Sequence, residues 1–244
     1  DIWDIVWIKQ RGINLSQHLV DSKLAARGKQ KKDFTLLIPV PDKAPHFTQN
    51  TPAFHNKKFN SKPTSIYPYT TSDGSLVGYM IRWDVLDKDK NPEKKFTSYL
   101  YVEDHKGKRY WKSVGFPEPR PLYNLFDVTN RSKSPVLVVE GEKVANALEP
   151  LVPDYIVTTS SNGSKSSHKT DWSTMKDRDV IICPDFDKAG IQYGNQVCLE
   201  CRKSGARSIR YLSVERIAKE LLGQDTVTQG YDLGDAVERG LDSV

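Results

Sequence analysis

The second half of the chain alternates short apolar runs with segments of helical spacing, and this pattern restricts the possible folds most strongly. Four apolar runs of buried-strand length occupy residues 135–139, 155–159, 179–183 and 208–212. Residues 141–151 carry apolar side chains at helical spacing, and a second helix is expected to begin at Asp187 and to end near Gly205. The apolar face of this second helix is expected to carry Ile191, Gly194, Val197, Cys198 and Cys201. Strands that alternate with helices predict a parallel sheet flanked by helices.

The first half has a different pattern. Residues 78–84, 95–101 and 110–114 alternate apolar and polar side chains, which predicts a small antiparallel sheet. The proline-rich segment 39–68 is expected to form little regular structure. Residues 129–135 are polar and lack apolar periodicity, which is typical of a linker or surface loop. We therefore expect a basic N-terminal α+β subdomain over residues 1–134, followed by an α/β domain over residues 135–244.

The charge of the chain is divided unevenly between these halves. The net charge of +5 consists of +9 over residues 1–134 and −4 over residues 135–244. A basic half next to an acidic half suits a polyanion-binding module beside a carboxylate-rich site. Two solvated surfaces of different charge explain the composition equally well.

No apolar run approaches the ~20 residues of a membrane-spanning helix, and no signal peptide is recognisable. The three cysteines are an odd number, which argues against a disulfide framework. A cytoplasmic location is the expectation from these features. The chain begins at Asp1 and not at Met, which indicates a piece of a longer protein.

Acidic side chains follow the predicted strands of the second half. Glu140 follows the first strand, Asp185 and Asp187 follow the strand at 179–183, and Asp232 and Asp235 form a third cluster that is also expected at a strand end. Ligands of open α/β sheets bind beyond the carboxyl ends of the strands, so these groups are expected to converge. Carboxylate oxygens are the ligands that Mg²⁺ prefers, and converging carboxylates repel one another unless a cation neutralises them.

These residues carry a resemblance to a known family. The segments 138–142 (VVEGE), 184–190 (PDFDKAG) and 231–235 (YDLGD) resemble the Glu, Asp-x-Asp and late Asp motifs of the Toprim domain, in the family's order. Toprim domains occur in bacterial-type primases, topoisomerases and some nucleases. The resemblance implies that Glu140 is the principal catalytic carboxylate, that Asp185 and Asp187 bind Mg²⁺ or Mn²⁺, and that Asp232 and Asp235 assist them. Whether Glu140 acts as a metal ligand or in acid–base chemistry is left open.

The first half is similar, more loosely, to the basic subdomain that precedes Toprim in bacterial replicative primases. It is closer still to the primases and primase–helicases of phages and plasmids. This resemblance implies that Arg82, Lys94, Lys95 and Arg120 line the channel for template and nucleotide. It also implies a replicative helicase as a partner, either as a neighbouring domain or as a separate protein. Each of the four cations is also an ordinary residue of a solvated strand.

A loop after the second predicted strand has small and hydroxylated residues that suit phosphate binding. Asn162, Gly163 and Lys165 lie in this loop, where backbone amides and a positive charge can approach a phosphate. A plain flexible loop explains the same residues equally well. Lys143 is interpreted as an anion contact or a residue of the helix surface.

The sequence therefore favours the catalytic core of a DNA primase, a nucleotidyltransferase. Such an enzyme joins nucleoside triphosphates into short RNA primers on single-stranded DNA, with Mg²⁺ or Mn²⁺. A Toprim nuclease is the alternative, and a topoisomerase is less favoured because the chain is short. A non-catalytic module that binds single-stranded DNA for a replication complex is a further alternative.

Overall fold

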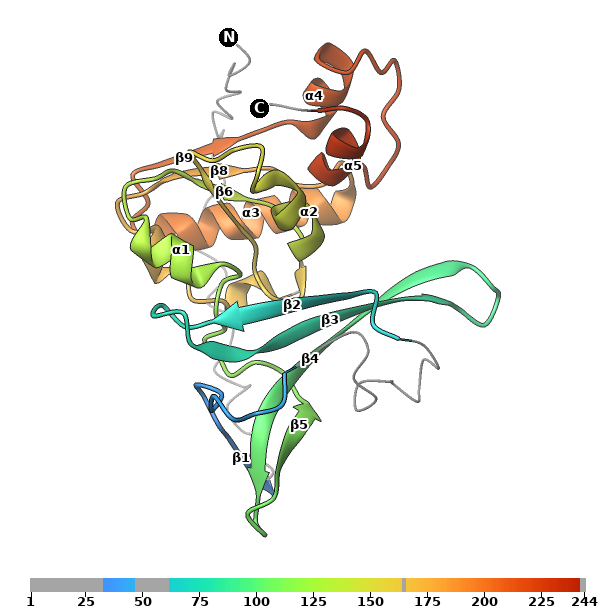
Figure 1. Cartoon of the computed structure of the whole chain (residues 1–244). Helices are drawn as coiled ribbons and strands as arrows, with labels where there is room; N and C mark the ends of the chain where they lie inside the picture. Colours follow the sequence, from blue (N-terminus) through green and yellow to red (C-terminus); the bar gives the residue numbers. More distant parts are fainter. Residues whose placement is uncertain (1–32, 47–61, 164–165, 242–244) are drawn as a thin grey trace, which may run out of the picture.

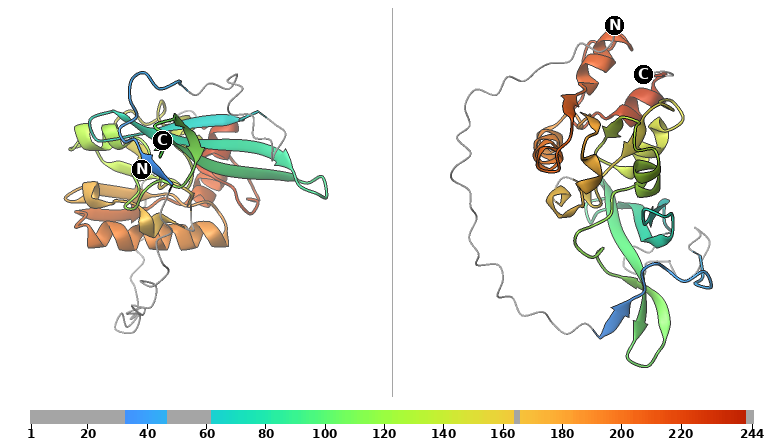
Figure 2. Two further views of the ribbon diagram at one scale, coloured as in Figure 1. Left: turned by 90° about the horizontal axis from the view of Figure 1, so that it is seen from below. Right: turned by 90° about the vertical axis from the view of Figure 1, so that its left-hand side faces the viewer.

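The computed structural model describes residues 33–46, 62–163 and 166–241. Two sheets organise these residues, and Figure 1 together with the right-hand view of Figure 2 shows the antiparallel sheet below the parallel sheet and its helices. No helix in the described ranges is long and apolar enough to cross a membrane.

The first sheet is antiparallel and has five strands. The path β1–β4–β3–β2 orders four of them, and β5 pairs with β4. The strands are β1 (Phe34–Leu36), β2 (Ser65–Thr70), β3 (Leu76–Leu86), β4 (Pro92–Asp104) and β5 (Arg109–Ser113). The three predicted strands are confirmed as β3, β4 and β5. The expectation for residues 39–68 is wrong at its end, because β2 begins at Ser65 and contains Pro68. An edge strand tolerates this proline, which cannot donate to the ladder.

The second sheet is parallel and has the order β7–β6–β8–β9. Its strands are β6 (Val136–Val138), β7 (Ile156–Thr158), β8 (Asp179–Ile182) and β9 (Ser208–Tyr211). The flanking helices are α1 (Leu125–Asn130), α2 (Glu142–Leu148), α3 (Lys188–Lys203), α4 (Val214–Glu220) and α5 (Leu233–Glu238). Two 3₁₀ turns, η4 (Ser167–Lys169) and η5 (Ser173–Met175), lie between β7 and β8. The predicted α+β and α/β architecture is confirmed.

The two central parallel strands, β6 and β8, consist mainly of buried apolar residues because both of their faces are covered. Leu137 and Ile181 pack on one face with α2, α4 and α5, whereas Val138 and Ile182 pack on the other face with α3. Ile191 does not belong to the buried face of α3, since its side chain is 59% exposed, and Tyr193 occupies the core there instead. Only Ile191 was therefore assigned to the wrong face, because Gly194, Val197 and Cys201 are buried as expected and the partly buried Cys198 packs against the same cluster.

One hydrophobic core joins the two sheets. Tyr69, Met80 and Leu100 of the antiparallel sheet belong to the same buried cluster as Val139 and Leu148 of the parallel half. Helix α1 occupies part of the predicted linker, because it continues to Asn130. The domain boundary at residues 134 and 135 stays a prediction.

Candidate active site

The predicted carboxylates lie where β6, β8 and α5 meet. Glu140 comes two residues after the end of β6, and Asp185 comes three residues after the end of β8. Burial raises the pKa of Asp185 to about 8, and the charges of four neighbouring carboxylates add to this effect. These four are Glu140, Asp232, Asp187 and Asp235. The other four predicted carboxylates therefore all lie within electrostatic reach of Asp185.

Asp187 forms the N-cap of α3, as the sequence predicted. Its Oδ1 atom accepts a hydrogen bond from the Gly190 backbone N–H at 2.6 Å. The turn between β8 and α3 is so tight that a Cβ atom on residue 190 would lie 2.2 Å from the carbonyl oxygen of Asp185. Glycine at this position lets the chain return to the sheet edge and carry both aspartates with it.

The third acidic cluster does not follow a strand, so our expectation of a strand end there was wrong. Asp232 begins helix α5, and it forms a reciprocal capping box with Asp235. The two backbone-to-carboxylate distances in this box are 2.8 and 3.1 Å. An antiparallel bridge between Phe186 and Tyr231 brings the start of α5 beside the Asp185–Asp187 turn. Asp232 and Asp235 therefore cap helix α5 and also lie at the site.

The carboxylates suit a hard divalent cation by their donor chemistry. Burial and like charge also raise the pKa of Asp232, so the cluster binds protons in place of a cation over part of the pH range. Across the three described stretches, no three Asp, Glu, His or Cys side chains are arranged to hold one metal ion. Asp187, Asp232 and Asp235 each use one oxygen for helix capping. Mg²⁺ is commonly held by only one or two carboxylates, with waters or substrate phosphates as its other ligands, so the set fits such an ion with or without a bound nucleotide.

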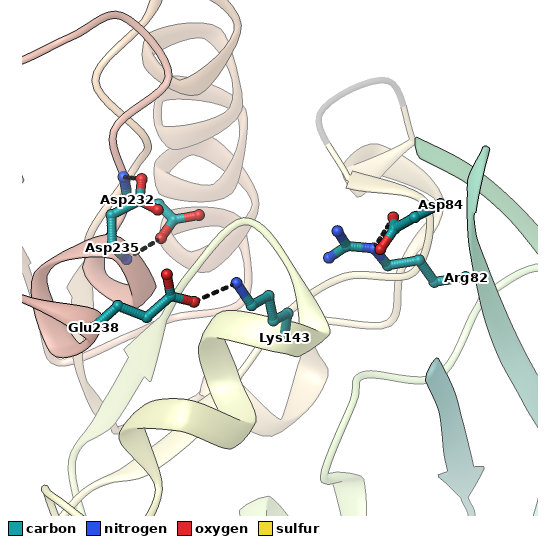
Figure 3. A network of polar contacts seen from close by, with 6 residues as sticks. All are labelled: Arg82, Asp84, Lys143, Asp232, Asp235 and Glu238. Carbon is teal, nitrogen blue, oxygen red and sulfur yellow. Dashed lines mark hydrogen bonds and ion pairs between the residues drawn. The ribbon is translucent and has the colours of Figure 1, made fainter. Parts of the chain in front are cut away.

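Two cations lie beside the acidic cluster, and Figure 3 shows them with their partners. Lys143 in the first turn of α2 pairs with Glu238 of α5 at 2.7 Å. Arg82 of β3 pairs with Asp84 at 2.7 Å, and the Arg82 side chain is only 12% exposed. The positive charge of Arg82 acts against protonation of Lys143, whose pKa is nevertheless raised because it donates to Glu238. The basic sheet thus presents an arginine to the acidic half.

The other predicted nucleic-acid contacts are not all brought together. Strand register pairs Asp84 with Lys94 and Arg82 with Phe96, so Lys94 shares a sheet face with Arg82. Lys95 pairs in register with Trp83, and these two residues lie on the opposite face. Lys95 also forms an ion pair with Glu93. Only one of the two adjacent lysines therefore faces the side of the sheet that carries Arg82.

Arg120 lies in the segment between β5 and α1. Its backbone bridges to Thr170, and its Nε and one terminal nitrogen are buried without a hydrogen-bond partner among the described residues. A partly buried guanidinium group with two unpaired donors suits an anionic ligand. The segment that supplies Thr170 also includes Ser166, which contacts the phosphate-loop candidates.

The loop after β7 lies next to Glu140. A Cβ atom on Gly163 would stand 4.0 Å from the Glu140 carbonyl oxygen. Asn162 and Gly163 both have positive φ angles, and the Ser166 hydroxyl donates to the Asn162 carbonyl at 3.2 Å. Lys165 lies outside the described residues. The proposed phosphate contacts Asn162 and Gly163 thus border the carboxylate cluster.

Sequence reasoning missed Tyr193 of α3, whose buried side chain contacts the strand ends next to the site. Its hydroxyl group donates to the Val139 carbonyl at 3.0 Å and lies 3.3 Å from the Thr159 hydroxyl. Burial raises the pKa of Tyr193 to about 12, and the charge of Glu140 contributes. This tyrosine therefore ties the ends of β6 and β7 together directly before Glu140. A fully buried tyrosine on a helix needs a polar partner, and this was the available signal.

These features define a fold in which a basic antiparallel sheet precedes a Toprim-like parallel domain with a carboxylate cluster. No protein-family model and no curated protein matches the chain. Several solved primase structures are similar to it. The Pseudomonas aeruginosa DNA primase domain is 18% identical, with a TM-score of 0.42, over 76% of this chain and 51% of that one. The Escherichia coli primase catalytic core is 20% identical, with a TM-score of 0.41, over 71% and 47%.

A chain in a bacteriophage T7 structure, which contains a DNA polymerase and the primase domains of two gp4 subunits, is also similar. It is 19% identical, with a TM-score of 0.43, over 72% of this chain and 71% of that chain. This chain spans about half the length of the Pseudomonas and Escherichia primase chains. At these identities the likeness concerns the course of the chain and not the roles of individual residues.

Proposed function

We propose that this chain is the catalytic core of a DNA primase, which joins nucleoside triphosphates into short RNA primers on single-stranded DNA. The observation that carries the proposal is the carboxylate cluster around Asp185, with Lys143 and Arg82 beside it. Polymerisation needs a site for a metal-bound triphosphate and an adjacent surface for a polyanion. The acidic and basic halves meet these two needs with different residues.

In this proposal, one or two of the carboxylates of Glu140, Asp185 and Asp187 hold each Mg²⁺ or Mn²⁺ ion together with substrate phosphates, and Asp232 and Asp235 contribute negative charge. When bound, the cation stabilises the charge that develops on the transferring phosphoryl group. Lys143 and the backbone amides around Asn162 and Gly163 bind the triphosphate, and Lys165 supplies positive charge. Arg82, Lys94 and Arg120 contact nucleic acid, and Lys95 contributes from the far face of the sheet. A replicative helicase is the proposed partner in the cell.

The ion pairs at the site are compatible with ligand binding. Lys143 and Glu238 are 51% and 63% exposed, and exposed pairs contribute only about 0–1 kcal/mol. A triphosphate can therefore replace Glu238 as the partner of Lys143 at small cost. Arg82 is more buried, and its pairing with Asp84 holds the guanidinium group ready for a phosphate.

The test is to incubate the protein with single-stranded DNA, labelled nucleoside triphosphates and Mg²⁺ or Mn²⁺. The proposal predicts RNA oligomers in the wild type and none in folded Glu140→Gln, Asp185→Asn or Asp187→Asn. Asn is also a good N-cap residue, so Asp187→Asn removes the charge while it keeps the helix start. Degradation of the DNA would indicate a nuclease instead, and retention without chemistry would indicate a binding module. Full activity in all three folded variants would exclude this site.

A further inference from the structure

Helix α2 follows Glu140 directly, and its apolar residues Val144, Ala145 and Leu148 pack in the shared core, but its first turn has no side-chain cap. Gly141 is the N-cap residue and provides no side-chain cap. A Cβ atom on Gly141 would touch nothing within 4 Å, so the connection from β6 to α2 is not held by packing at this residue. The orientation of α2 relative to Glu140 must therefore come from contacts along the helix.

Two tyrosine hydroxyl groups supply such contacts from outside the parallel sheet. Tyr69 of β2 donates to Glu142 Oε1 at 2.7 Å, in a pair that is 0% and 6% exposed. Tyr123, in the segment before α1, donates to Asn146 Oδ1 at 2.8 Å. Glu142 and Asn146 are one helical turn apart, so the two bonds hold successive turns of α2.

The Tyr69–Glu142 bond is the one that lies next to the reacting groups. Glu142 is two residues from Glu140 and adjacent to Lys143, whereas Asn146 is a full turn further along. Tyr69 packs against Phe116 and Tyr123, with ring centroids 4.8 and 5.4 Å apart. This aromatic packing makes Tyr69 a rigid point of attachment for the start of α2.

Burying the Glu142 carboxylate in an otherwise apolar cluster costs more free energy than burying an apolar side chain there would. The same cluster contains Val77, Met80, Leu100 and Val144, so an apolar residue at position 142 would suit its surroundings. A hydrogen bond differs from apolar packing because it fixes direction as well as contact. The pair is therefore better suited to set the geometry of α2 than to stabilise the core.

We propose that Tyr69 and Glu142 are positioning residues, which orient the start of α2 so that Glu140 and Lys143 face the basic sheet in a productive arrangement. The proposal deepens the primase function and rests on it. Groups that hydrogen-bond directly to a metal ligand commonly change metal affinity by about 10- to 100-fold when they are removed, and the lower end of this range is expected for Tyr69, which bonds to Glu142 and not to a ligand. Tyr69 would thus act on the metal through Glu142 and Glu140, without touching the ion itself.

The test measures Mn²⁺ affinity by electron paramagnetic resonance in the absence of nucleotide and DNA, together with melting temperature and primer synthesis. Tyr69→Phe should weaken Mn²⁺ binding about tenfold or more. Glu142→Gln keeps an acceptor for the tyrosine and should stay within about twofold of the wild type. Tyr123→Phe, which removes the other hydroxyl contact to α2, is the matched control and should also bind Mn²⁺ normally.

The double variant Tyr69→Phe/Glu142→Leu separates positioning from stability. Replacing both partners by apolar groups restores packing, so its melting temperature should approach that of the wild type while its Mn²⁺ affinity stays low. Recovery of both properties would overturn the proposal, as would normal Mn²⁺ affinity in Tyr69→Phe or a wild type that binds no Mn²⁺. A wild type that binds Mn²⁺ but makes no primers would refute the proposed function alone.

Discussion

At the scale of single residues, Asp185 has the largest pKa shift among the carboxylates of the site. Its carboxyl group is partly buried, and four other carboxylates surround it. Protonation relieves this repulsion in the metal-free protein, which is why the pKa of Asp185 rises to about 8. A divalent cation would relieve the same repulsion in place of the proton.

The shifted pKa of Asp185 predicts how stability depends on pH. The folded state holds the proton more tightly than the unfolded chain between pH 3.8 and about 8. The unfolding free energy of the metal-free protein should therefore fall as pH rises through this window, by at most about 1.4 kcal/mol per pH unit for this group. Asp185→Asn should flatten the fall and melt at a higher temperature than the wild type at pH 8.

Chemical denaturation at several pH values in EDTA measures this effect. The exposed Asp177→Asn serves as the control and should keep the wild-type slope. If the unfolding free energy of Asp185→Asn falls equally steeply with pH, the burial and repulsion that we assign to the Asp185 carboxylate are not present.

The sequence allowed Glu140, Asp185 and Asp187 to be predicted as neighbours because strand ends of a parallel sheet share one edge. It did not allow Tyr69, Glu142 or Tyr193 to be singled out. Their roles arise from hydrogen bonds between residues 73 and 54 positions apart, and local patterns do not encode such pairings.

At the scale of elements, strand alternation divides the basic residues of the antiparallel sheet. Met80, Arg82 and Lys94 lie on the face toward the parallel half, because Met80 belongs to the shared core and strand register places Lys94 opposite Asp84. Lys95 lies on the face of Trp83, which packs in a separate cluster with Tyr79 and Ile81. Lys94 and Lys95 are adjacent in the sequence but lie on opposite faces of the sheet.

This separation predicts different effects of charge reversal at the two lysines. Lys94→Glu should weaken single-stranded DNA binding and reduce the slope of log affinity against log salt by about 0.7 for each lost phosphate contact. Lys95→Glu should have a smaller effect on both quantities. Fluorescence anisotropy over a series of salt concentrations measures the slopes. Equal effects of the two variants would argue that the basic half binds DNA without a preferred face.

The ion pair between α2 and α5 gives a second prediction at this scale. Glu238→Gln releases Lys143 from its partner at the end of α5. Nucleoside triphosphate binding in Mg²⁺ should become tighter by up to about fivefold, since an exposed ion pair costs at most about 1 kcal/mol to break. Glu220→Gln, which breaks an exposed pair within α4, is the control. Weaker binding in Glu238→Gln would show that Lys143 does not contact the nucleotide.

Two elements that the sequence did not reveal depend on distant contacts. Strand β2 contains a proline and forms because β3 offers it an edge. Helix α5 has only six residues, too few to be stable alone, and the bridge between Phe186 and Tyr231 sets its start. The longer α3 and the apolar parallel strands have strong local signals and were predicted close to their bounds.

At the scale of the whole molecule, a shared core holds the acidic and basic halves together. The acidic half has a net charge of −4 and repels a phosphate backbone, whereas the basic half has +9. Neither half alone can hold a nucleic-acid end beside a metal-bound triphosphate. The core that includes Tyr69 and Val139 keeps Arg82 within electrostatic reach of Lys143.

The most direct test of this account is to measure DNA and nucleotide binding separately, each with Mg²⁺ and with EDTA. Labelled single-stranded DNA and a labelled nucleoside triphosphate are titrated with the whole chain. The account predicts that chelation abolishes triphosphate binding but reduces DNA binding only slightly, because the carboxylates hold nucleotide through the cation and the basic sheet holds DNA without it. Triphosphate binding that ignores EDTA, or equal loss of both ligands, would contradict it.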